Sequence, residues 1–128
     1  MTPETGLFLD KARKLLAEAD TMLAIGLNDA AGRTAYLAGF HAAQALISER
    51  TGRSVKTHRG VQSEFQRLTR ADASLAPDLR GFLSSTYNLK AIADYDTGPE
   101  AEVSPQEAKD AVVKAKRFVA HFAAMLSE

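Results

Sequence analysis

Residues 50–60, RTGRSVKTHRG, hold four basic side chains and one imidazole and contain no acidic residue. Cations bind phosphate oxygens, and an imidazole near neutral pH can exchange a proton with a substrate. RNA cleavage uses both groups, because a base removes the proton of the 2′-hydroxyl and cations stabilise the charge that develops on phosphorus. The stretch therefore predicts a phosphate-binding site, and RNA cleavage is the reaction that such a site would support.

The start of a helix is expected in the middle of this stretch. Thr57 is a good N-cap residue, so the free N–H groups of the first helical turn would lie beside the basic side chains. His58 would lie in that turn, where the helix dipole disfavours imidazolium and lowers the pKa. We predict His58 and Arg53 as catalytic residues, with Lys56, Thr57 and Arg59 binding phosphate. The alternative is that His58 only satisfies backbone groups at the helix start.

Arg33 and His41 lie upstream, on a helix expected over residues 28–52. Arg33 shares a stripe with apolar residues, where an arginine should be paired, and Asp94 or Asp96 is its expected partner. His41 has Phe and Ala as neighbours, and a histidine in this setting more often packs and hydrogen-bonds than binds a ligand. Both are included as candidate phosphate contacts, because this helix and the start of the next are consecutive and could share one cleft.

Length and charge limit the classes of protein that fit. The 128 residues suffice for one self-sufficient domain, expected over residues 1–128. Sixteen basic and sixteen acidic residues give no net charge, which argues against a protein that coats nucleic acid with its whole surface. Residues 50–70 nevertheless contain six basic residues and one acid, whereas residues 94–110 contain six acids and one lysine. Such segments either mark partner surfaces or neutralise each other in the fold.

Several kinds of site and location are not expected. The chain has no cysteine, which excludes disulfides and thiolate metal sites. Asp94 and Asp96 diverge on a helix and do not form a metal clamp alone, so no metal or other cofactor is predicted. No apolar run approaches the ~20 residues that span a bilayer, and the N-terminus lacks the pattern of a signal peptide. We expect a cytoplasmic protein that does not associate with membranes.

Apolar residues recur at helical spacing along almost the whole chain, and no window shows strand alternation. Capping residues, glycines and prolines set the expected ends, of which the Ser-Pro-Gln-Glu capping box at residues 104–107 is the clearest. The expected helices cover residues 2–26, 28–52, 57–70, 77–95 and 104–126. Short connections between four or five such helices predict an all-α fold, an antiparallel up-and-down bundle.

The stretch GRTAYLAGFHAAQALISERTGRSVKTHRGVQSEF resembles the HEPN domain family, in particular its small stand-alone bacterial and archaeal type. That type shows Arg-x-x-Tyr-Tyr-Ala-x-x-His-Ala-Ala-x-Ala-Leu, then Lys-Thr-His-x-Gly at a helix start, and later Arg-x-x-Ala-Asp-Tyr. The matching positions here are Arg33, Tyr36, Ala38, His41, Ala42, Ala43, Ala45, Leu46, Lys56, Thr57, His58, Gly60, Ala93, Asp94 and Tyr95. The resemblance extends over most of the chain.

This resemblance implies a HEPN-like helical bundle that forms a homodimer. It also implies a minimal nucleotidyltransferase as partner, the two acting as antitoxin and toxin. Many family members are metal-independent RNases with an Arg-x(4–6)-His motif, which Arg53 and His58 match. That motif usually lies within a helix at a dimer cleft, whereas Arg53 is expected in a loop. Two other motif positions differ, since Leu37 replaces a tyrosine and Lys90 replaces an arginine.

Three functional hypotheses therefore stay open. The first is a metal-independent RNase that acts as a toxin, with His58 as the base. The second is a non-catalytic subunit that binds nucleotide or nucleic acid at the same basic stretch and assembles with a nucleotidyltransferase. The third is a structural helical dimer, which predicts no salt-sensitive RNA binding.

Overall fold

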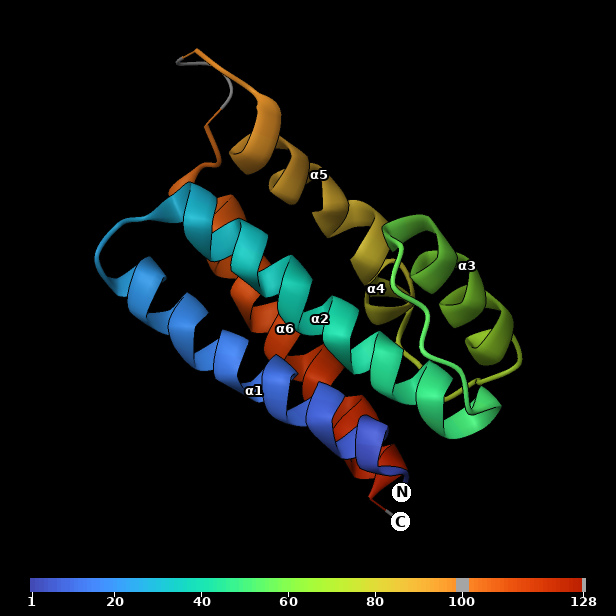
Figure 1. Ribbon diagram of the computed structural model, residues 1–128. Coiled ribbons are helices and arrows are strands. Elements are labelled where there is room, and N and C mark those ends of the chain that lie inside the picture. The colour runs from blue at the N-terminus through green and yellow to red at the C-terminus, as the bar shows by residue number, and fades with distance from the viewer. Residues whose placement is uncertain (99–101, 128) are drawn as a thin grey trace.

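The computed structural model describes residues 1–98 and 102–127, and every regular element in these ranges is a helix (Figure 1). The helices are α1 (Pro3–Ala24), α2 (Asn28–Thr51), α3 (His58–Thr69), α4 (Pro77–Arg80), α5 (Phe82–Tyr95) and α6 (Pro105–Leu126). The predicted all-α class is confirmed. Two residues that the sequence singles out lie outside the described residues. They are Pro99, which is expected to prevent a helix from continuing, and Glu100 of the acidic segment.

Local side-chain signals set the starts of three helices as the sequence predicts. Thr2, Thr57 and Ser104 are the N-caps of α1, α3 and α6, and each side-chain oxygen accepts a hydrogen bond from the N–H three residues later. Ser104 and Glu107 complete the expected capping box. Each cap satisfies an N–H group that the helix itself cannot pair, which stabilises the helix by about 1 kcal/mol.

One predicted boundary is wrong. The helix expected over residues 77–95 is divided at Gly81, whose φ of −90° and ψ of 2° are not helical. The Arg80 guanidinium donates hydrogen bonds to the carbonyls of Thr69 and Asp72, at 2.7 Å each. These bonds pair carbonyl groups at the end of α3 and hold Arg80 against them. Glycine is a poor helix former, so the chain bends at Gly81 and α4 remains a separate single turn.

Helix α2 is the centre of the bundle and packs against α1, α3, α5 and α6. Fifteen of its 24 residues are buried, most of them Ala, Gly and other small side chains that let neighbouring helices approach closely. In Figure 1, α1 and α5 run antiparallel to α2, and α6 runs parallel to it. No helix of the described residues is long and apolar enough to cross a membrane.

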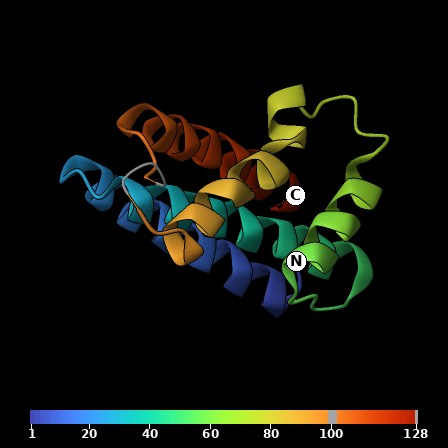
Figure 2. The same cartoon turned by 90° about the horizontal axis from the view of Figure 1, so that it is seen from above.

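The connection between α2 and α3 decides where the start of α3 lies. After α2 ends, residues 52–57 fold back along it, so that α3 begins beside the middle of α2 and the first turns of α5 (Figure 1). Figure 2 shows, from above, that α3 and α4 lie at the end of the bundle where α2 finishes. The reversal brings the basic stretch next to residues that precede it by several helical turns.

Candidate functional site

His58 is the first residue of α3 and lies against α2 and α5. Its Nδ1 is 2.9 Å from the hydroxyl oxygen of Tyr36. Its ring centroid is 4.8 Å from that of Phe40 and 5.6 Å from those of Tyr36 and Tyr87. Three aromatic rings thus hold a half-buried imidazole in one orientation. Its Nε2 is not enclosed and has no hydrogen-bond partner among the described residues, so this is the nitrogen that can reach a ligand.

Tyr36 determines which nitrogen of His58 carries the proton. Burial raises the pKa of Tyr36 to about 12, so its hydroxyl is neutral at physiological pH. The amide nitrogen of Gln62, which can only donate, is 3.5 Å from the Tyr36 oxygen. Tyr36 is fully buried, and Nδ1 of His58 is the one acceptor among the described residues that its hydroxyl proton can reach, so we place the proton on that bond. We therefore assign neutral His58 the tautomer with its proton on Nε2, which makes that edge a hydrogen-bond donor.

The pKa of His58 is lowered, as predicted, but mainly for a reason that the sequence did not reveal. Burial among the aromatic rings is the largest cause, and the positive charge of Lys90 adds to it, whereas the negative charge of Asp94 opposes it. The predicted helix start at Thr57 is present, and burial of the ring accounts for the largest part of the shift in the pKa of His58. His58 is consequently neutral at physiological pH.

Arg33, Lys90 and Asp94 form an ion network that borders this imidazole. Asp94 Oδ1 accepts a hydrogen bond from Arg33 Nε at 2.6 Å, and Oδ2 accepts one from Lys90 Nζ at 2.7 Å. The bond from Lys90 is the largest cause of the lowered pKa of Asp94, and Arg33 adds to it. The predicted pairing of Arg33 with an aspartate is confirmed for Asp94. Two cations share one carboxylate, so the network keeps an excess positive charge.

The two cations of the network differ in their access to a ligand. Arg33 is bound to Asp94 through Nε, and its side chain is 42% exposed. No described residue binds its two terminal amino groups, which can contact an anion with the guanidinium already oriented. The Lys90 side chain is only 9% exposed, and its ammonium is 6.0 Å from the ring centroid of Tyr87. Arg33 can therefore reach an anion directly, whereas Lys90 can contribute only its charge.

Arg53 and His58, the predicted catalytic pair, have different partners. Arg53 forms an ion pair with Glu64 at 2.9 Å, and Arg67 binds the other oxygen of that carboxylate at 2.7 Å. Glu64 follows His58 by six residues on α3, which puts the two side chains about 120° apart around the helix. Within one chain, the described contacts do not bring Arg53 and His58 together.

The remaining predicted residues of the basic stretch lie at the surface. Lys56 and Arg59 are exposed, and neither has an ion-pair partner within residues 1–98 and 102–127. Thr57 is also exposed, but its hydroxyl already accepts a hydrogen bond from the N–H of Gly60 at 3.0 Å. Both cations are exposed and can meet an anion, whereas the main task of Thr57 is to cap α3.

His41 also packs against Phe40, and the ring centroids of His41 and Phe40 are 5.5 Å apart. Its Nδ1 is 2.7 Å from Oε1 of Gln44, whose Nε2 donates to the carbonyl of Val55 at 2.8 Å. Because the amide nitrogen faces a carbonyl, Oε1 must accept, and His41 carries its proton on Nδ1. The His41, Gln44 and Val55 chain of hydrogen bonds fixes the returning loop to α2, so His41 supports the site and its Nδ1 is not available to a ligand.

Sequence reasoning missed the aromatic and lysine members of this site, Tyr36, Tyr87 and Lys90. The helical stripes predict Tyr36 and Tyr87 only as core residues, although Tyr36 follows Arg33 by three positions and so shares its helix face. Tyr87, Lys90 and Asp94 are spaced by three and four residues on α5, which is the corresponding signal there. Helical periodicity could have indicated the polar face of α2 and that of α5, but it could not have shown that the two faces contact each other.

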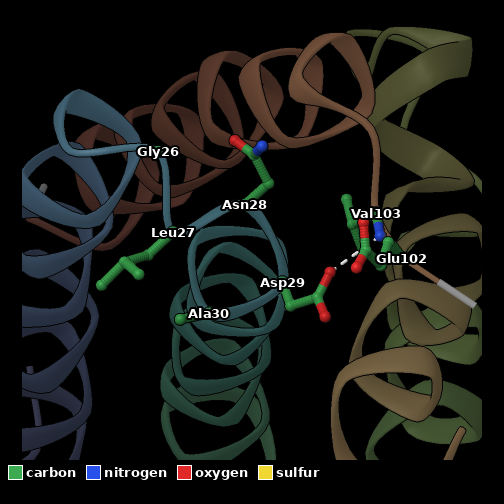
Figure 3. Close-up of a pocket in the computed structure, with 7 residues that line it drawn as sticks. All are labelled: Gly26, Leu27, Asn28, Asp29, Ala30, Glu102 and Val103. Atoms are coloured by element: carbon green, nitrogen blue, oxygen red, sulfur yellow. Dashed lines mark hydrogen bonds between the residues drawn. The ribbon is translucent and has the colours of Figure 1, made fainter. Parts of the chain in front are cut away.

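A separate hollow of about 350 Å³ lies at the turn between α1 and α2 (Figure 3). It is lined by Gly26, Leu27, Asn28, Asp29, Ala30, Glu102 and Val103. Figure 3 shows Asp29 directed at the backbone of Val103, whose N–H donates to Oδ1 at 2.7 Å. This bond attaches the segment before α6 to the start of α2. The hollow contains none of the predicted site residues.

Comparisons with known proteins identify the family. Residues 5–124 match the model of the HEPN domain. A UPF0332 protein of Archaeoglobus fulgidus is 34% identical over 123 residues, covering 87% of this chain and 97% of that protein. The crystal structure of TT1696 from Thermus thermophilus has the same fold, with a TM-score of 0.80 at 21% identity, over 96% of this chain and 98% of that one. The chain belongs to the HEPN family.

Proposed function

We propose that this HEPN protein binds RNA through its phosphate groups, at the surface where the start of α3 meets α2 and α5. The proposal rests on the hydrogen bonding of Arg33. Asp94 binds its Nε, and no described residue binds its two terminal amino groups. A guanidinium fixed in this way can bind phosphate with two parallel hydrogen bonds and little further ordering. Nε2 of His58 borders the same surface and supplies a donor.

Charge around this surface supports an anionic ligand. Lys56 and Arg59 are exposed on either side of His58 in the chain, and the first turn of α3 adds the partial positive charge of a helix N-terminus. Asp94, the carboxylate whose charge acts on His58, is shared by two cations. A polyanion that contacts several of these groups would gain from each, and its affinity would fall with salt.

Cleavage of the bound RNA is a second candidate function, and the unpaired Nε2 of a neutral His58 favours it. To act as a base at Nε2, His58 must carry its proton on Nδ1, which requires the Tyr36 hydroxyl to turn and accept. Arg53 would have to leave Glu64, or be supplied by a second copy of the chain in a homodimer. The protein would then be a metal-independent toxin RNase with a minimal nucleotidyltransferase as its antitoxin.

Without cleavage, the same surface would serve a binding subunit that assembles with such a nucleotidyltransferase and presents RNA or nucleotide to it. The two candidates share the phosphate contacts and differ only in the chemistry at His58. One experiment on well-folded protein can therefore test binding first and cleavage second.

The test is a titration of labelled single-stranded RNA at several salt concentrations, followed by fluorescence anisotropy. Wild type should bind with an affinity that falls as salt rises, and Arg33→Gln should weaken binding and reduce the salt slope by about one. Lys14→Gln is the matched control, because Lys14 is an exposed cation on α1, which packs against α2 and α6. Equal effects of the two substitutions, or no salt-dependent binding by wild type, would contradict the proposal.

Cleavage is measured on the same samples in the presence of a metal chelator. Fragments that appear with wild type and disappear with His58→Ala, at matched folded fraction, would establish the RNase. Binding without fragments would leave the binding subunit as the function. His58→Ala must be compared at equal folded fraction, because its ring packs against Phe40 and two tyrosines.

A further inference from the structure

We infer that the RNA bound at this surface is single-stranded and that Tyr95 stacks on one of its bases. The inference rests on the proposed phosphate binding and adds to it the form of the RNA and the residue that contacts a base. The observation behind this inference is an aromatic side chain, Tyr95, that is not buried by packing within the fold.

Tyr95 is the last residue of α5 and, at 72% exposure, the most exposed large hydrophobic side chain among the described residues. The ammonium of Lys90 lies 5.2 Å from its ring centroid. This cation–π contact restrains the ring while most of its surface stays in water. An aromatic ring that is both restrained and exposed can accept a flat ligand with little loss of side-chain freedom.

The position of Tyr95 connects it with the phosphate contacts. The ammonium of Lys90 lies near both Tyr95 and Tyr87, and the Tyr87 ring is 5.6 Å from that of His58. Asp94, which precedes Tyr95 in the chain, binds both Lys90 and Arg33. The exposed ring therefore borders the same surface as the free amino groups of Arg33 and Nε2 of His58. One strand of nucleic acid can contact all three.

The kind of ligand follows from the chemistry at the ring itself. Cations alone attract single-stranded and duplex RNA in the same way, through phosphate. A tyrosine face instead stacks on a base, and only an unpaired base presents its face. Asp96 is exposed and adjacent to Tyr95, so its carboxylate disfavours a phosphate at this point and suits an uncharged base.

The experiment compares three labelled probes of about twelve nucleotides, a length suited to single-strand binding sites. They are single-stranded RNA, a blunt RNA duplex, and an abasic strand with the same phosphates and no bases. Tyr95→Ala should weaken binding of the single-stranded RNA by about 5- to 150-fold, the range expected for one base stacked on an aromatic ring. Binding of the duplex and of the abasic strand should change by less than about twofold, because neither presents an unpaired base.

Tyr95→Phe is the matched control and should keep the affinity for single-stranded RNA, because stacking needs the ring and not the hydroxyl. The inference is overturned if Tyr95→Ala affects all three probes equally or none of them, while salt-dependent binding persists. Failure of the proposed function looks different, because wild type would then bind none of the probes in a salt-dependent way. Circular dichroism and thermal unfolding confirm that each variant is folded.

Discussion

His41 and His58 both pack against Phe40, and burial lowers the pKa of both. Each has its Nδ1 engaged by one polar side chain, Gln44 for His41 and Tyr36 for His58. Gln44 accepts, so His41 is a donor at Nδ1, whereas Tyr36 donates, so His58 is a donor at Nε2. The two imidazoles are therefore assigned opposite tautomers in similar surroundings.

This difference shows how the hydrogen-bond partner of a half-buried histidine determines whether its other ring nitrogen stays available. The hydrogen bond of His41 continues through Gln44 to the backbone of Val55 and ends inside the protein. The hydrogen bond of His58 leaves its other nitrogen unpaired among the described residues, and Lys90 lies close enough to act on the imidazole. The two histidines share residue type, burial and aromatic contact. What differs is the partner of Nδ1, and that difference distinguishes the supporting His41 from His58, which is proposed to contact the ligand.

The largest expected effect is a loss of stability when the hydrogen bonds around His41 are removed. Gln44 is 4% exposed, and Gln44→Leu leaves Nδ1 of His41 and the carbonyl of Val55 without partners. We expect a loss of about 2–3 kcal/mol in the free energy of unfolding, measured by urea denaturation. Gln62→Leu is the control, and its 3.5 Å bond to Tyr36 should cost less than about 1 kcal/mol. Equal losses would show that the link to Val55 does not hold the loop.

The next effect concerns the helix start that positions His58. A Cβ at Gly60 would lie 2.6 Å from Oγ1 of Thr57 and 2.8 Å from Cγ1 of Val55. Gly60→Ala must therefore displace the cap of α3, at a cost of about 1–2 kcal/mol by thermal or urea unfolding. RNA affinity should fall as His58 moves. A variant as stable as wild type, with an unchanged His58 environment in NMR spectra, would contradict this role of Gly60.

A smaller effect concerns which ring nitrogen of each histidine carries the proton. Tyr36→Phe keeps the ring and removes the hydroxyl, so unfolding should cost only about 0.5–1 kcal/mol. Nitrogen-15 NMR of the imidazoles should show Nε2–H for His58 and Nδ1–H for His41 in wild type. In Tyr36→Phe the preference of His58 should weaken while His41 stays unchanged. Nδ1–H on His58 in wild type would refute the assignment.

The smallest expected effect is the dependence of stability on pH. Both histidines have folded-state pKa values below their unfolded value, so the unfolded chain binds more protons as the pH falls. Their contribution is fully present above the unfolded pKa of about 6.5 and is lost as the pH falls toward the folded values. Urea unfolding between pH 8 and pH 5 should show this decline, and replacing either histidine with glutamine should flatten it. A slope unchanged in both variants would contradict the two pKa shifts.

Much of the fold could be predicted from the sequence because it depends on local signals. Helix starts at Thr2, Thr57 and Ser104 follow from the capping residues alone. The break at Gly81 was missed because it depends on Arg80 reaching the end of α3, which is a contact between separate elements. The family motifs include residues that act locally and residues that contact other helices, and the sequence does not show which are which.

The candidate site was predictable only in part for the same reason. His58 and Arg33 were identified by their residue types, and the Arg33 pairing with Asp94 by the expectation that a half-buried arginine needs a partner. The sequence spacing between Arg53 and His58 indicated a pair, but it does not show that Glu64 binds Arg53 on another face of α3. The convergence of Tyr36, Tyr87 and Lys90 on His58 depends on the returning loop, which periodicity along single helices cannot reveal.

The most direct test of the central claim observes both histidines at once. The imidazole resonances of wild type are titrated with pH, without RNA and with saturating single-stranded RNA. The resonances of His58 should shift and its pKa should rise on binding, because a phosphate beside Nε2 favours the imidazolium form, while those of His41 should stay in place. Binding of RNA that leaves His58 unchanged, or that moves His41 instead, would contradict the assignment of the ligand surface to His58.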